Sequence, residues 1–382
     1  MKIDDVRVVV HARVMPATDG PVPPGLMPLG VLRIRTDGGV EGNAFVSGPG
    51  PASDVLCDQI VRLLKPVLLG RDPLDIGAIW GDLWKRRQFA NLLAIGAVDV
   101  ALWDLLGKVA GLPVHRLLGT CRTTVPAYIS SWVHRRPEDY ATEAAHYRAE
   151  GWTGYKLHPP TQLRRLGKVP DMTVQADIDA CRMVREAVDD DMVLMLDSAI
   201  AYDHAEALRV GRAIEEMAYH WYEDPLQPDD LHGYRHLRSK LDIPIVATEI
   251  TDGSLYSMPQ WITERATDAL RGDVLLKGGI TPLMKIAHLA EAFHMNCEVH
   301  DGFNALGNLA CVHVVMAIAN CEMYEVLTIN PTGTYGLDHL SYGLTEPIAF
   351  DPQWNVLAPT RPGLGHDIDW ALINSNVVAE LA

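Results

Sequence analysis

The sequence has few cysteines, and none of them belongs to a metal-binding or redox motif. Six cysteines stand apart among 382 residues, in apolar surroundings and without a Cys-x-x-Cys pair. This pattern predicts buried thiols in a reducing compartment rather than a disulfide framework. The N-terminal residues MKIDDVRVVV also lack the pattern of a signal peptide. We therefore expect a cytoplasmic protein.

Long uninterrupted hydrophobic runs are absent as well. The longest apolar region, NLLAIGAVDVALWDLLGKVAGL, contains Asp99 and Asp104. Acidic residues within such a run favour an amphipathic or buried helix over a membrane span. We expect no membrane partner.

Positive charge is scarce in this chain. Only 33 lysines and arginines stand against 49 acidic residues, which gives a formal net charge of −16. An acidic protein is a poor partner for a nucleic-acid backbone or an anionic membrane surface. If the substrate is an anion, the protein must bind it with local positive charge.

The first third of the chain has the pattern of an α+β unit. The runs VRVVVHARV and VLRIRTDGG predict strands, and PASDVLCDQIVRLLKPVLLG and the NLLAIG stretch predict helices. The segments MPATDGPVPPGLMPLG and SGPGPAS are rich in proline and glycine, which predicts loops. We interpret both loops as candidate mobile covers of a site.

From about residue 125, short apolar runs alternate with helical segments. Eight runs have the composition of strands: VPAYISSW, GYKLH, MVLMLD, HWYED, PIVATE, DVLLKG, NCEVH and YEVL. Eight strands separated by helices predict an α/β fold of the TIM (β/α) barrel type, in which reactive groups lie at the C-terminal ends of the strands. After about residue 340 the chain is rich in proline and glycine and loses this rhythm.

Three acidic residues end consecutive runs of this series at equal intervals. Asp197, Glu223 and Glu249 are each 26 residues apart. One strand, one helix and their loops fit this step, so the three carboxylates are expected at one mouth of the barrel. A hard divalent cation such as Mg²⁺ would neutralise such an oxygen-only cluster. The alternative, that each acid caps the following helix, does not require equal spacing.

Other polar residues lie on the predicted strands. Lys156 and His158 are two residues apart on the second strand, so their side chains share a face. Asp273 lies on the sixth strand, His300 on the seventh and Glu325 on the eighth. This order places titratable groups around the carboxylate cluster.

With these residues, nearly the whole sequence resembles the enolase superfamily, in its mandelate racemase/muconate lactonizing enzyme branch. The resemblance rests on the carboxylate triad, on GYKLH where the family usually has Lys-x-Lys, on DVLLKGG, on EVH and on the eighth-strand acid. It implies a modified TIM barrel over residues 123–340 with an N-terminal α+β capping domain over residues 1–122. The C-terminal segment, residues 341–382, is expected to pack back on the capping domain and complete it.

The resemblance also implies a cofactor and a chemical step. Asp197, Glu223 and Glu249 would bind Mg²⁺, which stabilises the enediolate formed when a base removes the proton α to a substrate carboxylate. A cation is needed because this proton is too weakly acidic for a side chain to remove unaided.

The catalytic groups follow from the same resemblance. His300 would act as general base or acid, oriented by Asp273, although Asp273 alone is also a candidate helix cap. Lys156 would contact the substrate carboxylate. His158 replaces the lysine that is usually the base on the opposite face, so it either transfers a proton or only hydrogen-bonds the substrate.

Glu325 matches the eighth-strand acid of the family. In one interpretation it is protonated and donates a hydrogen bond, which requires a raised pKa. In the other it is an ionised, salt-bridged acid at the barrel rim.

The expected reaction is β-elimination of water from an acid sugar, giving a 2-keto-3-deoxy acid. Two alternatives stay open: a racemase or epimerase of an α-substituted carboxylate, and a non-catalytic protein that binds metal and acid sugar. Specificity is expected from residues 21–29 and 46–52, whose low charge favours a monoacid or a less polar substrate. We also expect a homo-oligomer.

Overall fold

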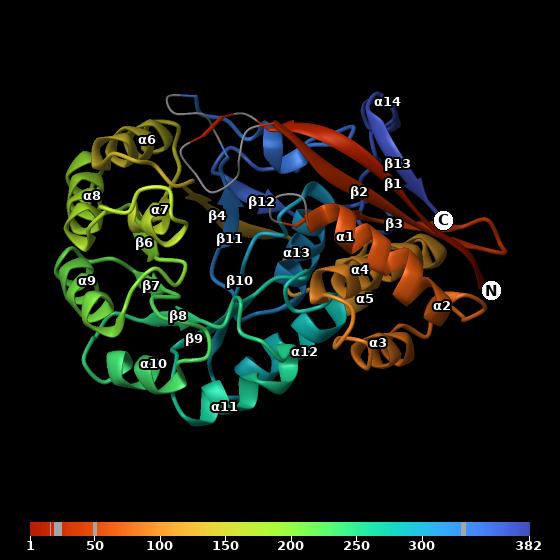
Figure 1. The fold of residues 1–382 in the computed structure, drawn as a ribbon, viewed down its shortest axis with the longest axis horizontal. Coiled ribbons are helices and arrows are strands. Elements are labelled where there is room, and N and C mark those ends of the chain that lie inside the picture. Colours follow the sequence, from red (N-terminus) through yellow and green to blue (C-terminus); the bar gives the residue numbers. More distant parts are fainter. Residues whose placement is uncertain (16, 19–24, 49–51, 330–333) are drawn as a thin grey trace.

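The computed structural model describes residues 1–15, 17–18, 25–48, 52–329 and 334–382. It contains a four-stranded antiparallel sheet and a larger, mainly parallel sheet that curls into a barrel (Figure 1). Among the described residues, no helix combines the length and apolar character needed to cross a membrane.

The antiparallel sheet combines both ends of the chain. Its strand order is β13-β1-β2-β3, with β1 at Ile3–Met15, β2 at Gly25–Thr36, β3 at Glu41–Val46 and β13 at Val377–Leu381. Val8 of β1 lies opposite Leu32 of β2 and Leu381 of β13. The C-terminal segment therefore adds a strand to the N-terminal sheet.

Helices pack against one face of this sheet (Figure 1). They are α1 (Ala52–Gln59), the π-helical turn Ile60–Leu64, α2 (Lys65–Leu68) and α4 (Leu92–Ala110). Two further helices, α3 (Ile76–Trp84) and α5 (Val114–Leu118), pack on α4. The longest, α4, begins at an Asn91 side chain that accepts the Leu93 N–H and ends at Gly111, which has a positive φ. Both are common helix-end signals.

Eight parallel strands form the barrel. In chain order they are β4 (Thr124–Ser130), β5 (Gly154–Leu157), β6 (Val193–Asp197), β7 (Trp221–Glu223), β8 (Ile245–Ala247), β9 (Ala269–Gly272), β10 (Asn296–Val299) and β11 (Tyr324–Leu327). Each pairs with the next, and β11 returns to pair with β4. Among the described residues no ladder joins β10 to β11, so the barrel is nearly closed.

A ring of helices surrounds the barrel (Figure 1). The helices that follow the strands are α6 (Pro137–Ala149), α7 (Thr161–Arg165), α8 (Val174–Ala187), α9 (His204–Glu216), α10 (Leu231–Arg238), α11 (Met258–Thr263), α12 (Ile280–Ala292) and α13 (Ala305–Ala317). Three short elements follow β11: the 3₁₀ turn η3 (Asp338–Ser341), strand β12 (Asn355–Leu357) and helix α14 (Trp370–Asn374). An earlier 3₁₀ turn, η2, spans Ser254–Tyr256.

The predicted fold class, a modified TIM barrel with an N-terminal α+β capping part, is confirmed. The domain boundaries after residues 122 and 340 stay predictions. In the loops expected to set specificity, residues 21–24 and 49–51 lie outside the described residues, whereas residues 25–29 begin β2 and Val46 ends β3.

The prediction of a sixth strand over DVLLKG, residues 273–278, is wrong. The strand is Ala269–Gly272, and the chain turns immediately after it. The Asp273 carboxylate accepts the N–H groups of Leu275 at 2.6 Å and Leu276 at 2.8 Å, which holds a turn rather than an extended strand.

The turn after β10 depends on a close approach between two glycines. A Cβ on Gly302 would lie 2.0 Å from the carbonyl carbon of Gly307 in the first turn of α13. By contrast, a Cβ on Gly77 of α3 would meet no atom within 4 Å. Gly302 therefore allows α13 to pack directly beside the end of β10.

We predict that Gly302→Ala lowers the free energy of unfolding by about 1–3 kcal/mol, because backbone must move to admit the methyl group. Gly77→Ala is the matched control and should stabilise α3 by up to about 1 kcal/mol. Urea denaturation of both variants measures the difference. A Gly302→Ala protein with wild-type stability would contradict the close packing.

Candidate active site

Three carboxylates meet at the C-terminal mouth of the barrel, as the spacing predicts. Asp197 ends β6, Glu223 ends β7 and is its register partner, and Glu249 follows β8 by two residues. One oxygen of each lies within 4.8 Å of the others. Asp197 and Glu223 are buried and Glu249 is half-buried, so the cluster opens toward the mouth at Glu249.

Glu249 reaches this cluster through a strained backbone. Val246 faces the barrel interior, whereas Ile245 and Ala247 face the surrounding helices. Strict alternation would turn Glu249 outward with them. Thr248 instead has a φ of 91°, a conformation that β-branched residues rarely adopt.

Lys277 holds this strained turn in place. Its buried Nζ donates to the carbonyls of Thr248 at 2.5 Å and Thr251 at 3.1 Å, on either side of Glu249. The Thr248 N–H donates to the Asp224 carboxylate at 3.2 Å. Surrounding structure therefore fixes the backbone that aims Glu249 inward.

Two buried cations lie beneath the carboxylates. Lys156 Nζ is 3.1 Å from Glu223 Oε2, 3.3 Å from Asp197 Oδ2 and 2.7 Å from Glu325 Oε1. Arg271 forms close ion pairs with Glu223 and Glu325, and its Nη2 donates to the Tyr128 hydroxyl at 3.1 Å. Neither cation is exposed to solvent. Each of the two therefore joins Glu325 to a predicted metal ligand.

Glu325 is an ionised acid in this arrangement. It lies within β11 rather than at its end, and its side chain is completely buried. Although burial raises its pKa, Lys156, Arg271 and His300 hold the pKa of Glu325 well below its usual value. The structure therefore favours the salt-bridged interpretation over a protonated hydrogen-bond donor, although Glu325 lies deeper than the barrel rim.

His158 contacts the cluster from the side of β6. Its Nε2 is 3.0 Å from Asp197 Oδ2, and its Nδ1 is 2.6 Å from the carbonyl of Ser131. A carbonyl accepts only, so Nδ1 carries a hydrogen and Nε2 faces the carboxylate. Burial lowers the pKa of His158, but Asp197 raises it more, and the net shift is upward.

His300 contacts the cluster from the other side. Its Nδ1 is 3.2 Å from Asp273 Oδ2, and its Nε2 is 3.5 Å from Glu249 Oε1. Burial lowers its pKa, whereas the acids Glu249, Glu325 and Asp301 raise it well above the usual value. The predicted pairing of His300 with Asp273 is thus present in the structure.

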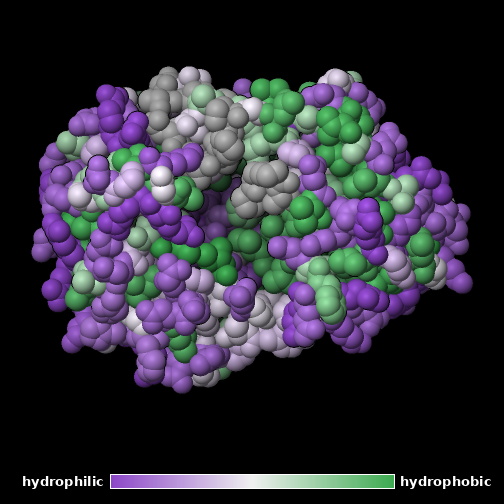
Figure 2. Space-filling model, viewed as in Figure 1, coloured by the Kyte–Doolittle hydropathy of each residue, from purple (hydrophilic) through white to green (hydrophobic). Residues whose placement is uncertain are grey.

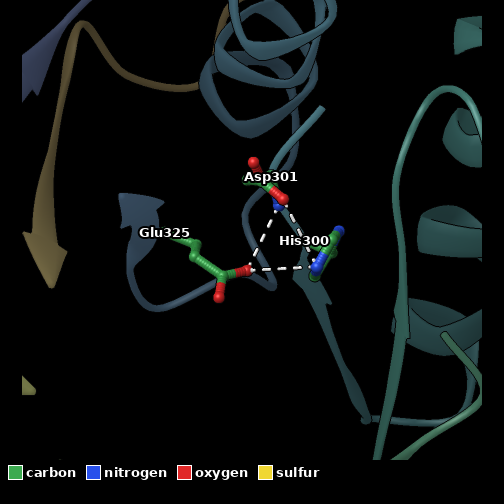
Figure 3. Close-up of side chains that lie close together, drawn as sticks. All are labelled: His300, Asp301 and Glu325. Atoms are coloured by element: carbon green, nitrogen blue, oxygen red, sulfur yellow. Dashed lines mark hydrogen bonds and ion pairs between the residues drawn. The ribbon is translucent and has the colours of Figure 1, made fainter. Parts of the chain in front are cut away.

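Figure 3 shows His300, Asp301 and Glu325 pointing toward one another. His300 Nε2 is 3.3 Å from Asp301 Oδ1 and 3.9 Å from Glu325 Oε2, and the Asp301 N–H donates to Glu325 Oε2 at 3.2 Å. Burial raises the pKa of Asp301 to about 6, against the opposing effect of His300. One side of the imidazole is therefore enclosed by carboxylates.

Sequence reasoning missed two members of this site. Arg271 went unnoticed because the sixth strand was placed four residues too late. With the strand at Ala269–Gly272, alternation puts Arg271 on the inner face, two residues before Asp273. Asp301 directly follows His300. Its carboxylate contacts the imidazole only because of the path of the backbone after His300, so no sequence signal predicts this contact.

The three strand-end carboxylates fit a magnesium ion. They offer only oxygen atoms, which Mg²⁺ prefers. Burial raises the pKa of Glu223 to about 7 despite the nearby Arg271 and Lys156. A divalent cation would favour the ionised form and offset the repulsion among the three acids.

A (β/α) barrel with three carboxylates at consecutive strand ends and a capping part built from both chain termini defines a recognisable class of proteins. The mandelate racemase / muconate lactonizing enzyme N-terminal domain matches residues 14–119, and the enolase C-terminal domain-like family matches residues 139–372. The second match alone spans more than half of the chain. The chain belongs to the enolase superfamily, in its mandelate racemase/muconate lactonizing enzyme branch.

Similar proteins include dehydratases and a racemase. Arabinonate dehydratase of Saccharolobus solfataricus is 30% identical over 327 residues, covering 83% of this chain and 82% of the relative. D-glucarate dehydratase from Agrobacterium tumefaciens, solved with magnesium, is 34% identical with a TM-score of 0.88, over 99% of this chain and 100% of that one. A racemase from Streptomyces coelicolor A3(2) with bound magnesium is 26% identical with a TM-score of 0.83, over 98% and 100%.

We predict that Arg271→Met lowers the free energy of unfolding by about 3–5 kcal/mol in metal-free buffer, because Glu223 and Glu325 then lose a buried counter-ion. The control is Arg238→Met, which removes a partly exposed ion pair with Asp268 and should cost about 0.2–1 kcal/mol. Denaturant titration compares the two. Equal losses would show that the interior ion pairs do not hold the barrel together.

Proposed function

We propose that this protein is a Mg²⁺-dependent acid-sugar dehydratase, a carbon-oxygen lyase. It removes the proton α to the substrate carboxylate and expels the β-hydroxyl as water, which yields a 2-keto-3-deoxy acid. The observation that carries this proposal is the His300–Asp273 pair, whose Nε2 lies 3.5 Å from Glu249 in the carboxylate cluster. The dehydratases among the similar proteins support the same reaction.

In the proposal, Asp197, Glu223 and Glu249 hold Mg²⁺. The ion supplies a Lewis acid that stabilises negative charge on the substrate carboxylate. Lys156 lies at the base of the cluster and adds positive charge beneath it. Glu325 acts as an ionised acceptor that keeps Lys156 and Arg271 in position.

His300 is the proposed base. Asp273 accepts a hydrogen bond from Nδ1–H, so Nε2 is the nitrogen directed at the site, and it offers a lone pair when the imidazole is neutral. As Nε2 takes the α-proton, the electrons of the Cα–H bond move onto the substrate carboxylate and form the enediolate. When the enediolate collapses, these electrons form a double bond between Cα and Cβ. The Cβ–O bond breaks, and the departing hydroxide takes a proton to become water. The resulting enol rearranges to the 2-keto acid.

His158 is the proposed second acid–base group. It contacts Asp197 at the end of β6, whereas His300 contacts Glu249, two residues beyond β8, so the two imidazoles flank the cluster on opposite sides. Either protonated imidazole is chemically able to protonate the leaving hydroxide. The same placement is the observation that favours a second candidate, a racemase or epimerase, in which one histidine removes a proton and the other returns one to the opposite face.

Several broader sequence predictions belong to this proposal. We propose a cytoplasmic homo-oligomer, with a capping domain over residues 1–122, a barrel over residues 123–340 and a C-terminal segment over residues 341–382 that completes the cap. The pairing of β13 with β1 supports the last point. The relatives' names include a monoacid, arabinonate, and a diacid, glucarate, and support an acid sugar of either kind.

A substrate screen tests the reaction. Purified protein with Mg²⁺ is incubated with stereochemical series of C5 and C6 aldonic and aldaric acids, with semicarbazide detection of 2-keto products and NMR detection of α-exchange in D₂O. We expect a keto product from at least one acid, and a loss of about 10²–10⁴-fold in kcat for His300→Asn. Exchange without a keto product would favour the epimerase, and silence in both assays would contradict a catalytic role.

We predict that Glu223→Gln removes high-affinity Mg²⁺ binding in calorimetry and abolishes turnover, because an amide cannot supply the anionic ligand. Glu298→Gln is the control: Glu298 is a buried acid on β10 that accepts the Glu322 N–H, away from the three-carboxylate cluster. Its Mg²⁺ affinity should match the wild type. Retained activity with normal Mg²⁺ dependence in Glu223→Gln would overturn the ligand assignment.

A further inference from the structure

Near the end of β1 lies a cation, Arg13, that has no acidic partner among the described residues. The guanidinium carbon of Arg13 is 4.1 Å from the centre of the Tyr342 ring, a cation–π contact. Arg13 is half-buried. Burial lowers its pKa, and Tyr342 is the one group among the described residues that acts against this effect. A half-buried arginine with no carboxylate beside it in the described part of the chain favours an anion from outside the chain.

A histidine with an unused ring nitrogen lies close to this arginine. His339, in η3, directs Nε2 at the carbonyl of Leu327 in a short hydrogen bond, so Nε2 carries the hydrogen. Its Nδ1 is buried and has no hydrogen-bond partner within the described ranges. Burial lowers the pKa of His339 to about 4, and the charge of Arg13 contributes to this shift. His339 is therefore neutral near pH 7, with Nδ1 free to accept a hydrogen bond.

Both residues belong to the rim of the barrel mouth. Leu327 is the last residue of β11, two positions after Glu325, and the next residue, Thr328, donates its N–H to the Ser130 carbonyl at the end of β4. Arg13 lies two residues before the end of β1, in the hairpin with β2. In the view of Figure 1 this end of the hairpin lies above β11, and Figure 2 shows a hollow near the middle of the same face.

We propose that Arg13 and His339 form a distal subsite that selects an acid sugar with a second carboxylate at its far end, an aldaric acid. This inference rests on the proposed function, which places the first carboxylate at the metal ligands. Arg13 would donate charge-assisted hydrogen bonds to the distal carboxylate, and His339 Nδ1 would accept a hydrogen bond from a neighbouring hydroxyl. The terminal CH₂OH of an aldonic acid would leave Arg13 without a counter-ion.

This subsite revises the substrate class expected from the loops. The monoacid preference was drawn from the low charge of residues 21–29 and 46–52, and Arg13 and His339 lie outside both ranges. The positive charge that a diacid requires comes from β1, an element that sequence reasoning assigned only to the capping sheet.

The test compares Arg13→Met with wild type on stereochemically matched pairs: galactarate with galactonate, glucarate with gluconate, and mannarate with mannonate. We expect wild type to prefer the diacid of the pair it converts. Arg13→Met should reduce kcat/KM for that diacid about 10- to 100-fold and change the monoacid value by less than about threefold. Arg13→Lys should restore part of the diacid activity, because it keeps the charge but loses the planar fork.

The matched control is Arg165→Met. Arg165 is the last residue of α7 and donates Nη1 to the Ala199 carbonyl at 2.9 Å. The charge of Asp197 acts on it, but no ion pair joins Arg165 to an acid among the described residues. It should leave the diacid-to-monoacid ratio unchanged. The subsite is overturned if wild type converts only monoacids, if Arg13→Met lowers both members of a pair equally, or if Arg165→Met alone shifts the ratio. Failure to convert any acid in the wider screen would instead overturn the proposed function itself.

Discussion

The ion pairs inside the barrel are the constraint on which the rest of the site depends. Lys156 and Arg271 have no solvent exposure, so only the carboxylates around them replace the water they have lost. Each joins Glu325, deep in the barrel, to Glu223 near the mouth. The two cations thereby reduce the repulsion among Asp197, Glu223 and Glu249 from the inside of the barrel. A divalent cation would reduce it from the side of the mouth.

This arrangement also determines what each group can do. Glu325 is committed to two cations, so it accepts hydrogen bonds and keeps its neighbours in place rather than donating a proton. In the proposed reaction, proton transfer is assigned to the two imidazoles, which reach the cluster from the ends of β5 and β10. Their separate anchors, the Ser131 carbonyl and the Asp273 carboxylate, fix the nitrogen that each presents to the site.

The carboxylate cluster was predictable because strand spacing in a barrel sets which residues share the mouth, and Asp197, Glu223 and Glu249 are equally spaced. The orientation of these side chains was harder to predict from the sequence. Glu249 points inward only because Thr248 adopts a positive φ, and no sequence pattern predicts that conformation. Arg271 was missed for a related reason. VLL following Asp273 has stronger strand propensity than ALRG, yet the Asp273 carboxylate binds the backbone beyond it and ends the strand early.

Substrate recognition at the proposed distal subsite depends on residues that are remote in sequence. The proposed metal ligands and the two histidines lie at or just beyond the ends of barrel strands whose order repeats regularly, so their positions follow from one rule. Arg13 and His339 come from opposite ends of the chain. They lie close together because Tyr342, beneath the Arg13 guanidinium, also forms a hydrogen bond with His11 of β1 at 2.8 Å. In this proposal, the pairing of the two ends of the chain in one sheet places the specificity-determining residues at the rim, while the charges inside the barrel are the same for any acid that binds.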